Sequence, residues 1–336
     1  MAAERLVAKE KESVLKSIPV DVLRDMYYML VKIRRAGERV ARLYPEQEMR
    51  CPIHLSIGQE AIAVGVCANL RKDDYAFSFH RCHAHYLAKG GDLKRLIAEL
   101  YGKSTGCARG VGGSMHLVAP EVGFMGASSI LAGAIPIAVG TALATVMQGL
   151  DRVSVAFFGD AGVEEGTFHE SLNFAALKSL PIIFVCENNL YAICSHLLAR
   201  QPVDNIFERG ESHRVPGLCV DGNDLLAVYQ AAKEAVDLCR RGQGPFLIEC
   251  KTYRWMEHVG PSYNYELGHN SKEELEKWMA RCPVGMHEKL LLENGILSRK
   301  DLDSIAKKVN AEVEEAVKFA KESPFPDEAE LLKNVY

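Results

Sequence analysis

Three short apolar runs, separated by helical patterns, constrain the fold of this 336-residue chain more than any other feature. They are VSVAFF (153–158), IIFVC (182–186) and FLIEC (246–250). Continuous β-rich runs are typical of strands covered on both faces, as in parallel sheets. The segment between the first two runs places Phe168, Leu172 and Ala175 on one helical face, and a second helix is expected at about 224–240. Repetition of this strand, helix, strand unit predicts an α/β fold with a doubly wound, mainly parallel sheet.

Helical patterns also flank this central region. Apolar residues recur at three- and four-residue steps from Leu23 onward and stop before Pro45, which predicts an opening helix. From about residue 271 the chain again shows helical patterns, with Glu and Lys on the outer face. We therefore expect one domain over 1–336, with the α/β core at about 50–255 and helical extensions at the N-terminus and at about 271–336.

A cluster of glycines precedes the first apolar run. Its members are Gly102, Gly106, Gly110, Gly112 and Gly113. This density is too high for a regular helix or strand, because glycine loses more conformational freedom on folding than any other residue. We expect a loop there that lies against a ligand or a neighbouring backbone.

Composition excludes several classes of protein. A formal net charge of −4 and dispersed Lys and Arg residues disfavour nucleic-acid binding. The ten cysteines contain no Cys-x-x-Cys pair, which favours a reduced, cytoplasmic setting over a zinc or redox motif. The charged N-terminus lacks the apolar core of a signal peptide, and no stretch of 18 apolar residues predicts a membrane span. An apolar content of 48% is ample for a large globular core.

Hard oxygen ligands follow two of the predicted strands. Gly159 and Asp160 come directly after the first run, and Asn189 and Tyr191 follow the second. The carboxyl ends of parallel strands meet at one edge of the sheet, where ligands bind. Adjacent strands lie about 4.8 Å apart, so one Mg²⁺ can accept oxygens from both. Because Mg²⁺ usually keeps phosphate oxygens in its shell, and a helix expected to begin near Glu164 favours an anion, the pattern predicts a phosphorylated ligand.

Two other interpretations of these residues are open. Gly-Asp after a strand is often a simple turn, and Asn-Asn often caps the next element. A dinucleotide-binding loop is the competing functional hypothesis, but Gly159, Gly162 and Gly166 lack the GxGxxG spacing.

A longer motif joins the two strand ends. The segment GDAGVEEGTFHESLNFAALKSLPIIFVCENN (159–189) resembles the thiamine-diphosphate signature, in which GDG is followed by NN one helix and one strand later. The resemblance continues through HLSIGQEA (54–61), FHRCHAH (79–85), GVGGSMH (110–116) and KTYRWMEHVG (251–260). It covers nearly the whole chain, which is similar to the alpha subunit of the decarboxylating component of pyruvate, branched-chain 2-oxo acid and acetoin dehydrogenases.

This resemblance implies a site for thiamine diphosphate and Mg²⁺. The Asp160 carboxylate, the Asn189 side chain and the Tyr191 backbone carbonyl would bind Mg²⁺ together with two diphosphate oxygens. Arg81 would hold the diphosphate by charge-assisted hydrogen bonds, next to His80, which replaces the family's tyrosine. The implied cofactor contacts are His80, Arg81, Ser129, Leu131, Gly159, Asp160, Ala161, Gly162, Asn189, Tyr191, Ile193 and His258.

Apolar and histidine positions complete the implied site. Ser129 and Leu131 would meet the aminopyrimidine ring, and Ile193 would hold the cofactor in the bent shape that brings its amino group to the thiazolium carbon. Simple core packing would also explain the two apolar side chains. His258 and His83 are the implied catalytic residues, because they match family histidines near the phosphates or the reacting intermediate.

A zinc site is an alternative interpretation of the histidine-rich segment. His80, Cys82, His83 and His85 all carry ligand atoms. Their spacing, however, matches no standard zinc pattern. Elemental analysis distinguishes the two interpretations.

Two departures from the family pattern bear on what it implies. GDG is Gly159-Asp160-Ala161 here, which keeps the carboxylate and only restricts the backbone. The loop serine that is phosphorylated in mitochondrial relatives is Val259, so phosphorylation is chemically excluded at that position. In the family, the loop that contains this position lies near the channel through which a lipoyl arm reaches the cofactor. Because the loop is altered here, the identity of the acyl acceptor stays open.

The resemblance implies an oxidoreductase that works with a beta subunit. It would cleave a pyruvate-like 2-oxo acid or acetoin and pass the acyl group to a lipoyl acyltransferase. The assembly would be an alpha-two beta-two heterotetramer, in which the beta subunit supplies the glutamate that activates the cofactor. One alternative is a non-oxidative transferase that delivers the two-carbon carbanion to an aldehyde, ketone or sugar. Another is a scaffolding relative without turnover, against which Asp160, Asn189, Arg81 and His258 argue.

Overall fold

A six-stranded parallel sheet forms the centre of the computed structural model, which describes residues 13–268, 270–330 and 332–333. In order across the sheet, the strands are β2 (Phe124–Ser128), β1 (Tyr75–Phe79), β3 (Ser154–Gly159), β4 (Ile182–Asn188), β8 (Phe246–Lys251) and β7 (Gly217–Asp221). The three apolar runs are the neighbouring strands β3, β4 and β8, which confirms the predicted parallel sheet.

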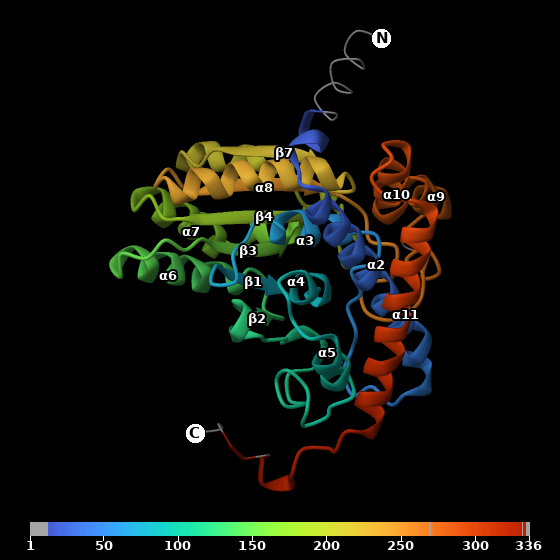
Figure 1. Cartoon of the computed structure of the whole chain (residues 1–336). Helices are drawn as coiled ribbons and strands as arrows, with labels where there is room; N and C mark the ends of the chain where they lie inside the picture. The colour runs from blue at the N-terminus through green and yellow to red at the C-terminus, as the bar shows by residue number, and fades with distance from the viewer. Residues whose placement is uncertain (1–12, 269, 331, 334–336) are drawn as a thin grey trace.

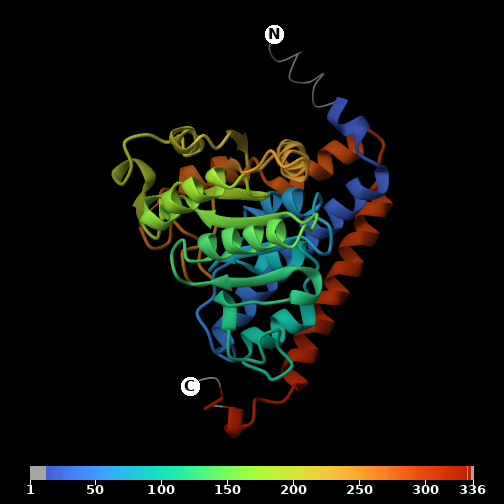
Figure 2. The ribbon, with the colours of Figure 1, turned by 90° about the vertical axis from the view of Figure 1, so that its left-hand side faces the viewer.

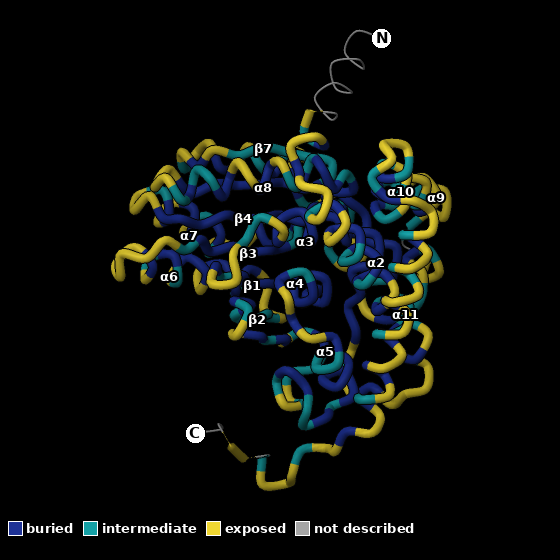
Figure 3. The backbone as a smooth tube through the Cα atoms, viewed as in Figure 1, coloured by how far each residue is buried: buried dark blue, intermediate teal, exposed yellow. Residues whose placement is uncertain are grey.

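Helices cover both faces of the sheet (Figure 1). They are α3 (Glu60–Cys67) and α8 (Leu225–Arg240) on one face, where α2 (Val20–Leu43) packs against α3, and α6 (Ala134–Met147) and α7 (Gly166–Leu177) on the other. Each face of the sheet has its own apolar core. Val155 and Ile183 belong to the core that contains α3 and α8, whereas Ala156 and Phe184 belong to the core that contains α6 and α7. Because successive side chains of a strand point to opposite faces, both faces bury apolar groups, which explains the continuous apolar runs. Figure 3 shows the central strands as buried backbone.

Three predicted helices are confirmed. The opening helix is α2, and the helix expected at 224–240 is α8, whose cap is the Asp224 side chain accepting the Leu226 and Ala227 N–H groups. The helix expected to begin near Glu164 is α7, which begins at Gly166. Residues Asp160–Glu164 form a short 3₁₀ turn, which keeps Asp160 at the edge of the sheet.

Sequence patterns missed three strands, β1, β2 and β7. The strands β2 and β7 lie at the two edges of the sheet and are only partly buried. They carry glycines and polar residues, because an edge strand needs less apolar surface than a central one. A short hairpin of β5 (Tyr191–Ala192) and β6 (Ser195–His196) follows β4.

The glycine cluster wraps around a buried carboxylate at the end of α5 (Leu93–Leu100). Backbone N–H groups of Ala108, Gly110, Gly112 and Gly113 donate to the Glu99 carboxylate at 2.8–3.0 Å. A Cβ at Gly110, which has φ +82°, would lie 2.7 Å from the Gly102 backbone. The loop therefore packs against a neighbouring backbone, one of the two expected reasons for its glycines.

Helices also form the C-terminal part of the chain. They are α9 (Lys272–Met279), α10 (Pro283–Glu293) and α11 (Arg299–Glu322). Helix α11 runs along α2 and α5 at the side of the molecule, as Figure 2 shows in red. Its N-terminus carries a capping box between Ser298 and Asp301. Among the described helices, none combines the length and apolar character that a bilayer crossing requires.

Candidate functional site

A pocket of about 270 Å³ lies where the chain leaves the carboxyl ends of β2, β1, β3 and β4. Its lining residues are Phe79, His80, Arg81, Ser129, Leu131, Gly159, Asp160, Ala161, Asn189, Tyr191, Ala192, Ile193, Arg254 and His258. In parallel sheets this edge is the general place for ligands, because strand ends and helix N-termini meet there. The position of the pocket therefore agrees with the edge predicted from sequence.

The structure brings nearly all predicted cofactor contacts together in this pocket. Only Gly162 is not among the lining residues, and it is buried beside the Phe158 ring. Of the two predicted catalytic histidines, His258 lines the pocket. His83 does not line it, because its imidazole is buried against Ser114 instead.

Asp160 is a buried carboxylate with a cationic partner. Its side chain is held by Arg200, which also pairs with Glu164. Gln201 donates to the Asp160 backbone carbonyl at 3.2 Å and to the Glu164 carboxylate at 2.8 Å. Burial raises the pKa of Asp160, and the charge of Arg200 opposes that shift. A carboxylate in this setting favours a bound cation, since it is 2% exposed and has little water around it.

The Asn189 amide is held from two sides. Its Nδ2 donates to Gln59 Oε1 at 3.3 Å, and its Oδ1 accepts the Tyr191 N–H at 3.2 Å. Gln59 in turn donates to Glu187 at 2.8 Å, and Glu187 contacts His85 at 2.9 Å. This buried network fixes the orientation of the Asn189 amide at the edge of the pocket.

Two buried arginines line the pocket without a carboxylate partner. Within the described residues, neither Arg81 nor Arg254 forms an ion pair, and the Nε group of each has no hydrogen-bond partner. Arg81 donates to the Leu55 carbonyl at 2.8 Å, and Arg254 donates to the Tyr191 carbonyl at 3.4 Å. Burial and the charge of Arg254 lower the pKa of Arg81 to about 9. Because buried cations are costly unless paired, this end of the pocket is suited to an anion.

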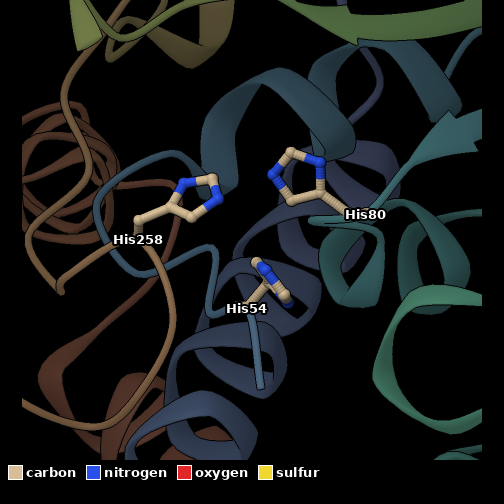
Figure 4. A group of neighbouring side chains, drawn as sticks. All are labelled: His54, His80 and His258. Carbon is tan, nitrogen blue, oxygen red and sulfur yellow. The ribbon is translucent and has the colours of Figure 1, made fainter. Parts of the chain in front are cut away.

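Three imidazoles from distant segments meet beside Arg81 (Figure 4). The ring centroids of His54, His80 and His258 lie 4.8–5.3 Å from one another. Burial and the charge of Arg81 lower the pKa of His54 and His258 to about 3 and that of His80 to about 2. All three rings are therefore neutral at physiological pH.

Sequence reasoning assigned no role to several residues of the site. His54, Gln59 and Arg254 lie within segments that carry the family resemblance, so a signal was present in the sequence. Arg200 lay outside those segments, and no sequence pattern pointed to its contact with Asp160.

The alternative interpretation as a zinc site is wrong for its four residues, which are His80, Cys82, His83 and His85. His83 faces Ser114 at 2.8 Å, whereas His85 lies between Ser78 and Glu187, each at 2.9 Å. These ligand atoms point to different partners, and the candidate metal group found among the described residues is a different set, His54, His80 and His258.

Substituting glutamine for His83 is expected to reduce the acid sensitivity of folding. Burial and the charge of Arg81 lower the His83 pKa to about 4, so below pH about 6.5 the unfolded chain binds a proton that the folded chain excludes. The free energy of unfolding is therefore unaffected by His83 above pH about 6.5, and it decreases as the pH falls from 6.5 toward 4. Urea unfolding of the cofactor-free protein at several pH values should show a slope smaller by up to about 1.4 kcal/mol per pH unit in the variant. Identical slopes would contradict this origin of acid sensitivity.

Hard oxygen ligands, unpaired cations and an apolar wall together suit a phosphorylated cofactor with a metal ion. Asp160, Asn189 and the Tyr191 carbonyl offer the oxygens that Mg²⁺ prefers. Leu131 and Ile193, which are 42% and 59% exposed, offer apolar surface beside them. The residues of the pocket therefore fit a cofactor that carries a diphosphate. The two buried arginines without a carboxylate partner support this fit independently of the motif similarity.

Comparison with known proteins adds a family match over most of the chain. The model of the dehydrogenase E1 component family matches residues 28–329. The chain is 41% identical over 312 residues to the alpha subunit of acetoin:2,6-dichlorophenolindophenol oxidoreductase from Bacillus subtilis (strain 168), covering 93% of this chain and 92% of that protein. It is also 41% identical over 340 residues to the chloroplastic pyruvate dehydrogenase E1 component subunit alpha-3 from Arabidopsis thaliana, covering 98% of this chain and 78% of that protein.

Proposed function

We infer the function from one premise: this chain belongs to the dehydrogenase E1 component family. It is an alpha subunit of a thiamine-diphosphate-dependent oxidoreductase of the pyruvate or acetoin dehydrogenase type. We propose that it cleaves a pyruvate-like 2-oxo acid or acetoin. The relatives named above are oxidoreductase subunits, which favours this reaction over the non-oxidative transferase alternative.

The observation that carries this proposal is that two buried arginines without a carboxylate partner, Arg81 and Arg254, line the same pocket as Asp160. Arg81 and Arg254 would bind the diphosphate, because charge-assisted hydrogen bonds to phosphate would satisfy their free N–H groups. Asp160, Asn189 and the Tyr191 carbonyl would bind Mg²⁺, after Arg200 releases the Asp160 carboxylate. When bound, thiamine diphosphate would supply a nucleophilic thiazolium carbon and an electron sink.

His258 is placed to donate a hydrogen bond into the pocket. The Nη2 group of Arg81, which can only donate, lies 3.5 Å from His258 Nδ1. Nδ1 of the neutral ring must therefore accept, which leaves the proton on Nε2. We propose that this Nε2–H group donates a hydrogen bond to the diphosphate or to the reacting carbonyl oxygen, as its predicted catalytic role requires.

A beta subunit is the partner that the family implies, and helix α6 offers a surface for it. One face of α6 is exposed and almost wholly apolar, with Ile137, Gly140, Ala144 and Met147 along it. Ile137 is 56% and Met147 is 78% exposed, and a Cβ added at Gly140 meets nothing within 4 Å. A helix that is apolar all round is normally buried, so we propose that the beta subunit covers this face.

Replacing Ala144 by aspartate is expected to weaken assembly with the beta subunit without unfolding the alpha chain. An exposed helix position tolerates a charge in water, but an apolar interface does not, since a buried unpaired carboxylate costs several kcal/mol. Copurification with a tagged beta subunit measures the effect. The matched control is Ala311→Asp on the exposed face of α11, which should leave assembly unchanged. Equal loss in both variants would argue against α6 as the interface.

A turnover assay tests the proposed function. The chain is purified with its beta subunit, supplied with thiamine diphosphate and Mg²⁺, and given pyruvate or acetoin with 2,6-dichlorophenolindophenol as electron acceptor. Dye reduction with release of carbon dioxide from pyruvate, or dye reduction with acetoin, supports the oxidoreductase. Product formation from an added aldehyde without any dye reduction would instead support the transferase, and cofactor binding without turnover would support a scaffolding role.

Two finer assignments stay predictions. A lipoyl acyltransferase as the physiological acceptor is testable by adding a lipoyl domain in place of the dye and measuring its acylation. A cytoplasmic location is also open to test, because relatives of this chain include chloroplastic enzymes.

A further inference from the structure

We propose that Gln59 is a positioning residue of the metal site, because it holds the Asn189 amide in the orientation that offers Oδ1 to Mg²⁺. This inference rests on the proposed function, in which Asn189 is a ligand of Mg²⁺. Gln59 is fully buried and does not line the pocket, so it would act on the metal only through Asn189.

The orientation of the Asn189 amide decides whether its side chain can bind a cation. Oδ1 is an acceptor with two lone pairs, whereas the Nδ2 group only donates and would repel a cation. Oδ1 accepts the Tyr191 N–H at 3.2 Å, which uses one lone pair and leaves the other for a metal ion. Nδ2 donates to Gln59 Oε1 at 3.3 Å, outside the pocket lining, so Oδ1 is the amide atom that remains for the pocket.

The hydrogen bonds around Gln59 run in one direction. The backbone N–H of Tyr191 can only donate, which fixes Asn189 Oδ1 as its acceptor and Nδ2 as the donor to Gln59. At the other end, the ionised carboxylate of Glu187 can only accept, so Gln59 turns Nε2 to it, at 2.8 Å, and Oε1 to Asn189. Both ends therefore require the same orientation of the Gln59 amide.

Glu187 is a fixed anchor for these hydrogen bonds. Its second carboxylate oxygen contacts His85 Nε2 at 2.9 Å. The His85 ring stacks on Phe157 with ring centroids 4.0 Å apart, and its Nδ1 lies 2.9 Å from Ser78 Oγ. Glu187 is 1% and His85 is 0% exposed, so water does not compete for these contacts. The protein core therefore sets the orientation of Gln59, and Gln59 passes it on to Asn189.

Replacing Gln59 by methionine should weaken metal binding without removing any proposed ligand. Methionine has a similar length but its thioether is a weak acceptor, which leaves Asn189 Nδ2 buried without a good partner. Because Tyr191 is only partly buried, its N–H can bond to water, and the amide can then rotate Nδ2 into the pocket. Outer-shell partners of metal ligands typically contribute a factor of ~10–100 in metal affinity, and we expect a loss of this size.

Two double variants test the acceptor at position 59 directly. In Gln59→Glu/Glu187→Gln the amide and the carboxylate exchange places at unchanged net charge. The carboxylate at position 59 can accept from Asn189 and from the amide at position 187, which can still accept from His85. Metal affinity should therefore be no more than a few-fold below that of wild type. Gln59→Met/Glu187→Gln lacks the acceptor for Asn189 and should bind metal as weakly as Gln59→Met.

Manganese binding provides a measurement that does not depend on turnover. Mn²⁺ prefers the same oxygen ligands as Mg²⁺, and electron paramagnetic resonance reports the free Mn²⁺ concentration. The full chain, copurified with its beta subunit, is titrated with Mn²⁺ at a fixed concentration of thiamine diphosphate, and a titration without protein is subtracted. We expect Gln59→Met to require ~10–100-fold more Mn²⁺ for half-saturation than wild type.

Asn69→Leu is the matched control. It removes a side-chain amide beyond the opposite end of α3, which donates to the Gly65 and Tyr229 carbonyls outside the pocket lining, and it should leave Mn²⁺ affinity unchanged. Circular dichroism and urea unfolding of each cofactor-free variant check that the fold is retained.

Three results would decide against these assignments. Equal Mn²⁺ affinity in wild type and Gln59→Met would overturn the positioning role, and a lower stability in urea at unchanged affinity would identify Gln59 as a purely structural residue. Equally weak binding in both double variants would overturn the role of the acceptor at position 59. A wild-type complex that binds no Mn²⁺ with thiamine diphosphate would instead contradict the proposed function.

Discussion

Replacing Asp160 by alanine is expected to abolish productive binding of thiamine diphosphate and Mg²⁺. Asp160 is the one carboxylate among the proposed metal ligands, and it is almost fully buried. Truncating one member of a buried charge pair usually costs about 2–5 kcal/mol, which corresponds to a roughly 30- to 5,000-fold loss of affinity. Isothermal titration calorimetry of the cofactor with Mg²⁺ measures this loss directly.

Glu164→Ala is the matched control for that experiment. Glu164 pairs with the same Arg200 as Asp160 but lies outside the pocket, so its removal tests the ion-pair network without touching a proposed metal ligand. We expect the cofactor affinity of this variant to stay within a few-fold of wild type. Wild-type cofactor affinity in Asp160→Ala would refute the metal assignment. An equal loss of affinity in both variants would show that the loss arises from the disturbed Arg200 ion pairs and not from a missing metal ligand.

Arg81→Met is expected to remove the diphosphate site while leaving the cofactor-free protein as stable as wild type or more stable. The guanidinium is fully buried beside Arg254 and has no carboxylate partner in the described structure, so it is held at a free-energy cost. An apolar side chain of similar length relieves that cost but cannot bind phosphate. Loss of this buried contact should reduce cofactor affinity by about 2–5 kcal/mol.

Thermal unfolding with and without cofactor separates these two effects. At 100 times its Kd, a ligand stabilises the folded state by about 2.7 kcal/mol, and this gain should nearly disappear in Arg81→Met. Arg209→Met is the control, because its Nε is also buried without a partner but the residue does not line the pocket. A cofactor-induced stabilisation of wild-type size in Arg81→Met would contradict the role of Arg81. A large loss of stability without cofactor would instead identify Arg81 as a structural residue.

Local sequence patterns were sufficient for three neighbouring strands of the sheet, β3, β4 and β8, and for one half of the site. The runs that became β3, β4 and β8 were recognised because each central strand is buried on both faces, which requires consecutive apolar residues. Asp160 and Asn189 were found for the same reason, since residues directly after adjacent parallel strands must meet at one edge. The edge strands β2 and β7 escaped detection because partial burial leaves no such pattern, and the interior strand β1 escaped it because Ser78 interrupts its short apolar run.

The sequence by itself therefore determined the α/β fold, the family and the place at the sheet edge of the oxygen-bearing residues that we propose as metal ligands. Only the tertiary structure decided which distant groups meet them: Arg254 joins Arg81, His54 joins His80 and His258, and Arg200 covers Asp160. The physical reason is that apolar periodicity reports the burial of a residue within its own element. Electrostatic and hydrogen-bonding partners depend instead on the order in which strands are placed in the sheet, which joins segments far apart in the chain.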